Sequence, residues 1–176
     1  MKQIFLLPGQ WAVPHEPSEV TTILGPCVAV CLFDRSRQMG GMNHFLLAAG
    51  GASGRERSRY GDTSCEDLVQ CLFASGSRPE DIEARIVGGA NVGRLSVAEG
   101  ESLGERNAEM ARSVLRRHHI AVGFEDTGGA AARRLRFRTG VGILEVKTIE
   151  GATSTTATIA AGHGSGTSDE KAQAAR

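Results

Sequence analysis

Apolar residues come in short β-rich runs near the start of the chain and in helically spaced stripes further on. The run 27–33 is apolar on both faces, which is typical of a buried strand. The run 41–47 has the composition of a returning strand, and residues 34–37 between the two are turn-like. The pattern therefore predicts a β-hairpin whose turn is centred on Arg35 and Ser36.

Two amphipathic helices follow in the pattern. Thr63 with Glu66, and Ser102 with Glu105, have the spacing of capping boxes, which predicts a helix start at each. Apolar residues then recur at helical spacing, and a Gly and a Pro end the first helix. The predicted buried stripes are Cys65, Leu68, Val69 and Leu72 in the first helix and Ala108, Ala111, Val114, Leu115 and His118 in the second.

Further strands are expected at 82–86, 120–124, 135–138 and 143–146. The first seventeen residues contain three prolines and read as an extended arm with turns. From Gly151 the composition becomes Gly, Ala, Ser and Thr without periodicity, which predicts a disordered tail over 151–176. The order of elements predicts one domain over 1–150, with an α+β layered fold of mixed or antiparallel sheet and two main helices.

Composition and charge narrow the class of protein. The 20 basic and 20 acidic residues balance, and only 5% of residues are aromatic, which argues against a nucleic-acid or anionic-membrane footprint. No segment reaches the roughly 18 apolar residues of a membrane span, and the N-terminal apolar stretch is too short for a secretory signal. Without an export signal, the four cysteines are expected to be free thiols in the cytoplasm.

The hairpin contains two candidate catalytic residues, Cys27 and His44. Cys27 follows a Gly-Pro pair at the mouth of the buried strand, and the predicted turn places His44 directly opposite, within reach for a nucleophile and its base. A register shift by one residue would turn the two side chains to different faces. The alternatives are a cysteine that only packs in the core and a histidine satisfied by backbone.

A third group should orient the imidazole, and Thr21 or Thr22 on the preceding strand could do so, although strand threonines often serve β-propensity alone. The apolar neighbours of His44 favour a tuned thiolate–imidazolium pair, so Cys27 should have a lowered pKa and react with iodoacetamide faster than Cys31. No metal or cofactor is expected, because Cys27 and Cys31 lack the spacing of a zinc knuckle.

Six strings in the chain form a recognisable set: LGPCVAVCL at 24–32 and GGMNHFLL at 40–47, with RYGD at 59–62, GGA at 88–90, GERN at 104–107 and DTGG at 126–129. Through these strings the chain closely resembles the chemoreceptor glutamine deamidase CheD family over about residues 1–147. The family usually has Ser before the nucleophile, where this chain has Pro26. Since proline has no N–H, an oxyanion hole here would need the Cys27 amide or other donors.

The resemblance implies a layered α/β sandwich and hydrolysis of glutamine side-chain amides on methyl-accepting chemotaxis receptors. It implies Cys27 as nucleophile, His44 as general base and acid, and Thr21 as the orienting residue, with Thr22 as the alternative. The CheC phosphatase is a partner of the family in some species, so it is a candidate partner here, although the resemblance does not imply it. The loops at 48–58 and about 90–102 are expected to flank an open groove. The competing hypothesis is a non-catalytic adaptor that binds the receptor or a CheC-type phosphatase.

Overall fold

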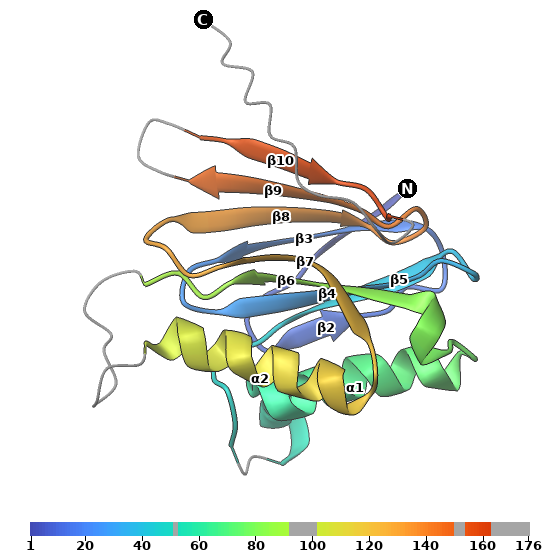
Figure 1. Ribbon diagram of the computed structural model, residues 1–176, viewed down its shortest axis with the longest axis horizontal. Coiled ribbons are helices and arrows are strands. Elements are labelled where there is room, and N and C mark those ends of the chain that lie inside the picture. Colours follow the sequence, from blue (N-terminus) through green and yellow to red (C-terminus); the bar gives the residue numbers. More distant parts are fainter. Residues whose placement is uncertain (51–52, 92–101, 150–153, 163–176) are drawn as a thin grey trace, which may run out of the picture.

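Two five-stranded sheets and a layer of helices are stacked on one another in the computed structural model, which describes residues 1–50, 53–91, 102–149 and 154–162 (Figure 1). The sheet that no helix covers, here the outer sheet, has the order β1 (Lys2–Phe5), β3 (Ser18–Leu24), β8 (Ala132–Arg138), β9 (Ile143–Ile149) and β10 (Thr156–Ile159). The helix-covered sheet has the order β2 (Gln10–Ala12), β5 (Met39–His44), β4 (Val28–Asp34), β6 (Ile82–Gly88) and β7 (Ala121–Thr127).

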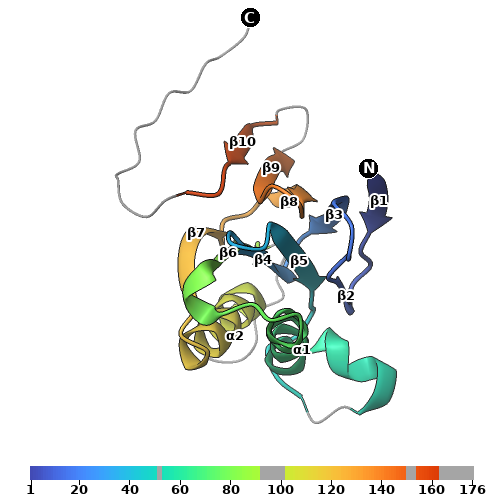
Figure 2. The same ribbon diagram turned by 90° about the vertical axis from the view of Figure 1, so that its right-hand side faces the viewer.

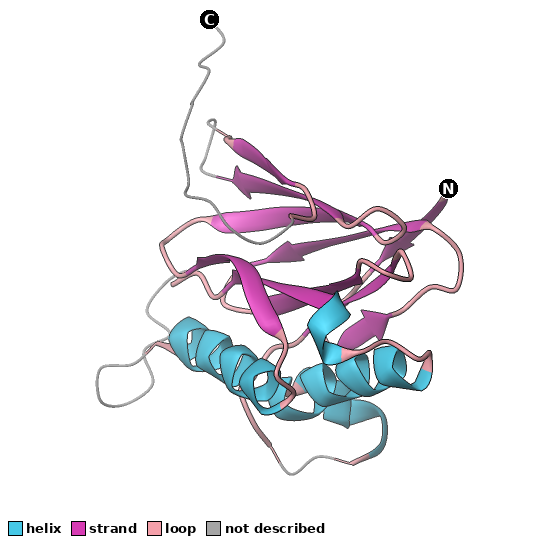
Figure 3. Cartoon of the chain, turned by 45° about the vertical axis from the view of Figure 1, so that its right-hand side comes forward, coloured by secondary structure: helices cyan, strands magenta, loops and turns pink. Residues whose placement is uncertain are grey.

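The helices α1 (Gly61–Ala74) and α2 (Leu103–Arg117) lie side by side on one face of the helix-covered sheet (Figure 2). Two short 3₁₀ helices, η1 (Gly54–Arg59) and η2 (Pro79–Asp81), complete the elements (Figure 3). Neither α-helix is long and apolar enough to cross a membrane, among the residues described. The predicted α+β layered architecture with two main helices is confirmed, and the layer of strands is two sheets.

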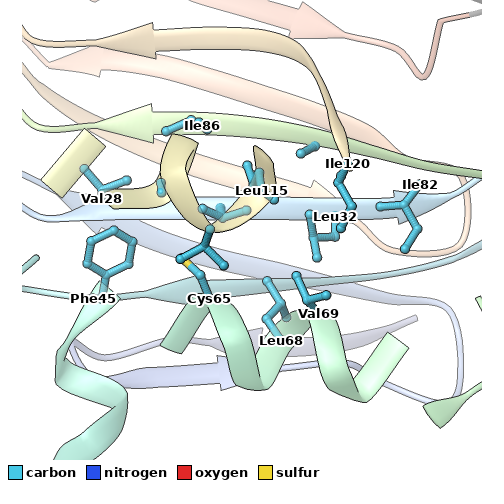
Figure 4. Packing of buried hydrophobic residues seen from close by; sticks show 14 of the residues in the cluster. Val28, Leu32, Phe45, Cys65, Leu68, Val69, Ile82, Ile86, Leu115 and Ile120 are labelled. Carbon is cyan, nitrogen blue, oxygen red and sulfur yellow. The ribbon is translucent and has the colours of Figure 1, made fainter. Parts of the chain in front are cut away.

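β4 lies at the centre of the fold, and its two faces pack into two different layers. Val28, Val30 and Leu32 face the helices, where they pack with residues of α1 and α2 (Figure 4). Ala29, Cys31 and Phe33 face the outer sheet. Every residue of β4 is buried, which explains why its sequence is apolar without alternation.

The hairpin of β4 and β5 is confirmed, but its register is two residues from the prediction. Cys31 pairs with Met42, and an isolated bridge joins Val28 to Phe45. The cause is a longer turn, because the Asp34 carboxylate accepts the N–H groups of Ser36 and Arg37 and holds four residues between the strands. Cys27 is therefore not directly opposite His44.

The second capping box is confirmed and the first is wrong. Ser102 and Glu105 exchange both hydrogen bonds of a capping box at the start of α2. The first helix begins at Gly61, and the Thr63 hydroxyl donates to the carbonyl of Tyr60. Gly61 permits this earlier start, since a Cβ there would overlap the ring of Phe45. The predicted stripes of both helices are buried except at His118, which follows the last residue of α2, is only partly buried and contacts the Glu66 carboxylate through Nε2.

Both ends of the chain add strands that the sequence did not predict. The arm predicted over the first seventeen residues contains β1 and β2, which pair with β3 and β5. Within the tail predicted to be disordered, Thr156–Ile159 forms β10 on the edge of β9. Pairing with an existing sheet edge satisfies the backbone of these segments, which composition alone does not reveal.

Candidate active site

Thr22 and His44 are hydrogen-bonded to each other in the layer between the two sheets, and Cys27 packs against the same layer. Thr22 is on β3 of the outer sheet, His44 ends β5, and Cys27 immediately precedes β4. The bridged pair Val28 and Phe45 faces the helices, so the residues before each of them, Cys27 and His44, face the outer sheet. The two are diagonal neighbours on one face, a separation that long side chains can bridge.

The imidazole of His44 is held by the hydroxyl of Thr22. The distance from Thr22 Oγ1 to His44 Nδ1 is 2.8 Å, and Oγ1 also lies 2.8 Å from the carbonyl oxygen of Leu6. A carbonyl can only accept, so the single hydroxyl proton goes to Leu6, and Oγ1 then accepts the Nδ1–H of His44. This chain of hydrogen bonds selects the tautomer in which Nε2 carries the lone pair.

Nε2 of His44 is buried and has no hydrogen-bond partner within the described residues. The side chain is 2% exposed, so water does not freely satisfy this nitrogen. A buried, unpaired acceptor is unfavourable unless it serves a purpose. Nε2 is therefore the atom available to take a proton from a thiol placed on the same face.

The structure places Thr21 away from His44, which corrects the expectation that Thr21 orients the imidazole. Because side chains alternate along β3, Thr21 is on the opposite face from Thr22, and its hydroxyl lies 3.4 Å from the carbonyl oxygen of Ile4. Thr22, the alternative considered from the sequence, makes the contact. The choice depends on which of the two side chains of β3 points toward His44. The sequence does not reveal this, because the two threonines are adjacent and identical.

Burial shifts both ionisable groups toward their neutral forms. Burial lowers the pKa of His44 to about 4, with a backbone hydrogen bond to Leu6 acting in the opposite direction. Burial raises the pKa of the Cys27 thiol, opposed by its own backbone N–H. The direction of the Cys27 pKa shift is therefore opposite to the expected lowering, and burial disfavours a thiolate–imidazolium pair in the resting protein.

Cys27 remains the accessible thiol of its strand. It is partly exposed, whereas Cys31 and Cys65 are fully buried, and burial raises the pKa of each of those two thiols to about 12. The expectation that Cys27 reacts with iodoacetamide faster than Cys31 therefore stays a prediction, with access rather than a lowered pKa as its reason.

Glycines hold the backbone of Cys27 in place. The N–H of Gly89 donates to the Cys27 carbonyl at 2.8 Å, and the N–H of Ala90 donates to the carbonyl of Gly25 at 2.9 Å. Gly88 has φ +120°, and a Cβ there would overlap the Cys27 carbonyl oxygen. The Gly88–Gly89 pair at the end of β6 therefore packs directly against the backbone of Cys27.

Asn107 of α2 is a site residue that the sequence reasoning missed. Its side chain is fully buried, and Nδ2 donates to the carbonyls of Pro26 at 3.1 Å and Leu46 at 2.8 Å. The signal was available, because Asn107 is a polar residue on the apolar stripe of α2 and closes the quoted string at 104–107.

Two further expectations concern ligands and loops. Among the described residues, no group of three or more His, Cys, Asp or Glu side chains is arranged to hold a metal ion. Of the two loops expected to flank the site, residues 51–52 and 92–101 lie outside the described residues. The remaining part of the first loop includes η1, which ends beside the start of α1.

Comparison with known proteins identifies the family of the chain. The model of the family described as "CheD chemotactic sensory transduction" matches residues 47–148. The chain is 40% identical to the "Probable chemoreceptor glutamine deamidase CheD" of Trichlorobacter lovleyi, over 82% of this chain and 89% of that protein. It is 37% identical to the protein of the same name from Zymomonas mobilis, over 85% of this chain and 81% of that one.

Proposed function

The chain belongs to the CheD family, and from this premise we propose that it is a chemoreceptor glutamine deamidase. The observation that carries the proposal is the hydrogen-bonded chain from Leu6 through Thr22 to His44, which leaves Nε2 free on the face that also carries Cys27. An accessible thiol beside an oriented, neutral imidazole is the arrangement that thiol-dependent amide hydrolysis requires.

We assign Cys27 as the nucleophile. As its sulfur attacks the carbon of the glutamine carboxamide, the thiol proton moves to His44 Nε2, and the carboxamide oxygen becomes an oxyanion. His44 then gives this proton to the departing nitrogen, which leaves as ammonia, and a thioester joins Cys27 to the substrate. A water molecule then gives a proton to His44 and attacks the thioester. The bond between carbon and sulfur breaks, which releases the glutamate side chain, and His44 returns its proton to the sulfur of Cys27.

The oxyanion would be stabilised by the backbone N–H of Cys27. Pro26 offers no N–H, and the Cys27 N–H lies near its own sulfur, where it opposes the rise of the thiol pKa. A donor beside the attacking sulfur is well placed for the charge that develops on the carboxamide oxygen. Donors supplied by residues 92–101 lie outside the described residues.

Thr22 would act through His44 rather than on the substrate. By accepting the Nδ1–H it fixes the ring orientation and favours the tautomer that can take the thiol proton. It also supplies a polar contact to the imidazolium formed during each transfer. This is the orienting role that the sequence assigned first to Thr21.

The site residues all lie within 1–150, and we assign the activity to that part of the chain. We also propose action in the cytoplasm, on the methyl-accepting chemotaxis receptors that the family acts on, with a CheC-type phosphatase as a second partner. Purified CheC-type protein should co-elute with the chain in gel filtration. Separate elution at micromolar concentrations of both would remove this partner and leave the deamidase proposal intact.

Mass spectrometry of receptor cytoplasmic fragments tests the function. Incubation with the wild-type chain should convert selected glutamines to glutamate, and Cys27→Ala should abolish the conversion. Cys31→Ala is the matched control, because Cys31 is four residues further along and fully buried, so conversion should persist. Conversion that survives Cys27→Ala would place the nucleophile elsewhere. Receptor binding without conversion by the wild type would favour the adaptor hypothesis.

A further inference from the structure

We propose that Asn107 is a positioning residue that sets the separation of Cys27 and His44. The proposal rests on the proposed function, since the reaction it serves is the one carried out by that pair. Asn107 does not touch the thiol or the imidazole. It contacts the two backbone segments that carry them, the residue before Cys27 and the residue two positions after His44.

The amide of Asn107 joins these segments where the β-ladder between them has stopped. β4 and β5 exchange their last pair of backbone hydrogen bonds at Val28 and Phe45. Two residues beyond Phe45, the N–H of Leu47, which a continued ladder would direct to the carbonyl of Pro26, donates to the carbonyl of Arg59 instead, and Pro26 has no N–H to return. The two hydrogens of Asn107 Nδ2 then bind Pro26 and Leu46, so the side chain bridges the strands in place of the missing ladder bonds.

The orientation of this amide is fixed by chemistry. Both contacts of Nδ2 are carbonyl oxygens, which only accept, so a flipped amide would place an oxygen against two oxygens. Both N–H donors are thus used, which leaves none for an oxyanion. The Oδ1 atom is buried and has no partner among the described residues, an unfavourable feature for a residue whose role was only to pack.

The packing of α2 explains how Asn107 reaches the site. Gly104, one helical turn earlier, lies against Gly89, and a Cβ at Gly104 would overlap the Gly89 carbonyl oxygen. Gly89 in turn donates to the Cys27 carbonyl. The start of α2 therefore contacts the backbone around Cys27 through two routes, and the missing side chain at Gly104 permits the approach that Asn107 needs.

Three variants of the full chain test the proposal. Asn107→Ala removes both donors, and we expect kcat for receptor glutamine conversion to fall about 10- to 100-fold, with KM within about twofold, as expected when reacting groups are misplaced. Asn107→Asp keeps one donor when its carboxyl is protonated, which burial favours, so it should lose less activity. Val114→Ala, two turns along the same buried face, is the control and should lower Tm while leaving kcat unchanged.

A second measurement tests the positioning role of Asn107 independently of the proposed deamidase activity. In a Cys71→Ala background, where Cys31 and Cys65 are buried, alkylation by iodoacetamide reports on Cys27. Asn107→Ala should lower the alkylation rate at pH 7 about tenfold, as His44→Gln should, and Val114→Ala should not. A rate equal to wild type in folded Asn107→Ala would overturn the positioning role, even if the wild type fails to convert receptor glutamines. An activity loss that only tracks Tm would overturn it as well.

Discussion

The two layers on either side of β4 have different contents. The layer beneath the helices contains the apolar side chains of both helices, and its buried polar side chains include the amides of Asn43 and Asn107. The layer between the sheets contains three buried basic side chains, His44, Arg85 and Arg133. The difference assigns the helix layer to holding the central strands in place, while the inter-sheet layer contains the group proposed above to transfer protons, His44.

The outer sheet makes the layer between the two sheets suitable for a general base. It supplies the Thr22 hydroxyl and, through the segment after β1, the Leu6 carbonyl that orient His44. Arg85, on the same side, is satisfied by the Glu83 carboxylate and the carbonyl of Gly142. His44 differs from Arg85 because its Nε2 has no hydrogen-bond partner in the part of the chain that the structure describes.

After the loss of the nucleophile Cys27, the largest effect on activity is expected at His44. His44→Gln retains a polar side chain at this position but cannot carry the proton between thiol, leaving nitrogen and water. We expect receptor glutamine conversion to fall about 10²- to 10⁴-fold, the usual contribution of a general acid–base. The rate is measured by mass spectrometry at saturating receptor fragment. Activity within tenfold of wild type would show that another residue is the general base, and it would contradict the proposed difference between the two layers.

The largest effect on stability is expected in the helix layer. Leu68 of α1 is fully buried, and Leu68→Ala should lower the free energy of unfolding by about 2–5 kcal/mol. Denaturant unfolding followed by circular dichroism measures this loss. The activity of the molecules that remain folded should stay within about twofold of wild type. A selective loss of activity at unchanged stability would show that the helix layer takes part in the chemistry directly.

Acid should weaken the inter-sheet layer through His44. Its pKa of about 4 in the folded protein lies below the ordinary 6.5, so the unfolded chain binds more protons between these values. His44 therefore destabilises the fold as the pH drops from about 6.5 to 4, by about 3 kcal/mol at the lower end. Unfolding curves at pH 7 and pH 4 measure the change. His44→Gln should lose about 3 kcal/mol less than wild type, and an equal loss would refute the assignment.

The sequence predicted the elements whose signals are local. The apolar run of β4, the stripes of both helices and the capping box at Ser102 each depend on side chains within a few positions of one another, and all are present. The false capping box at Thr63 shows the limit of such signals. Close packing of Gly61 on Phe45, sixteen residues away in the chain, starts the helix earlier than the local pattern does.

The site could be predicted in part, because Cys27 and His44 do share a face of one hairpin. The predicted register was off by two residues, and an even shift preserves the face. The choice between Thr21 and Thr22 depends on the phase of β3 against another sheet, and the bridge made by Asn107 depends on helix packing. Both are long-range contacts, which a single sequence does not encode in any short window.

The central claim is tested most directly by two neighbouring substitutions in β3. Thr22→Val and Thr21→Val each remove one hydroxyl with almost no change in volume, and their rates of receptor glutamine conversion can be compared by mass spectrometry. The account predicts a loss of about 10- to 100-fold for Thr22→Val, because Nδ1 of His44 loses its acceptor, and a rate within about twofold of wild type for Thr21→Val. The reverse order would contradict the account.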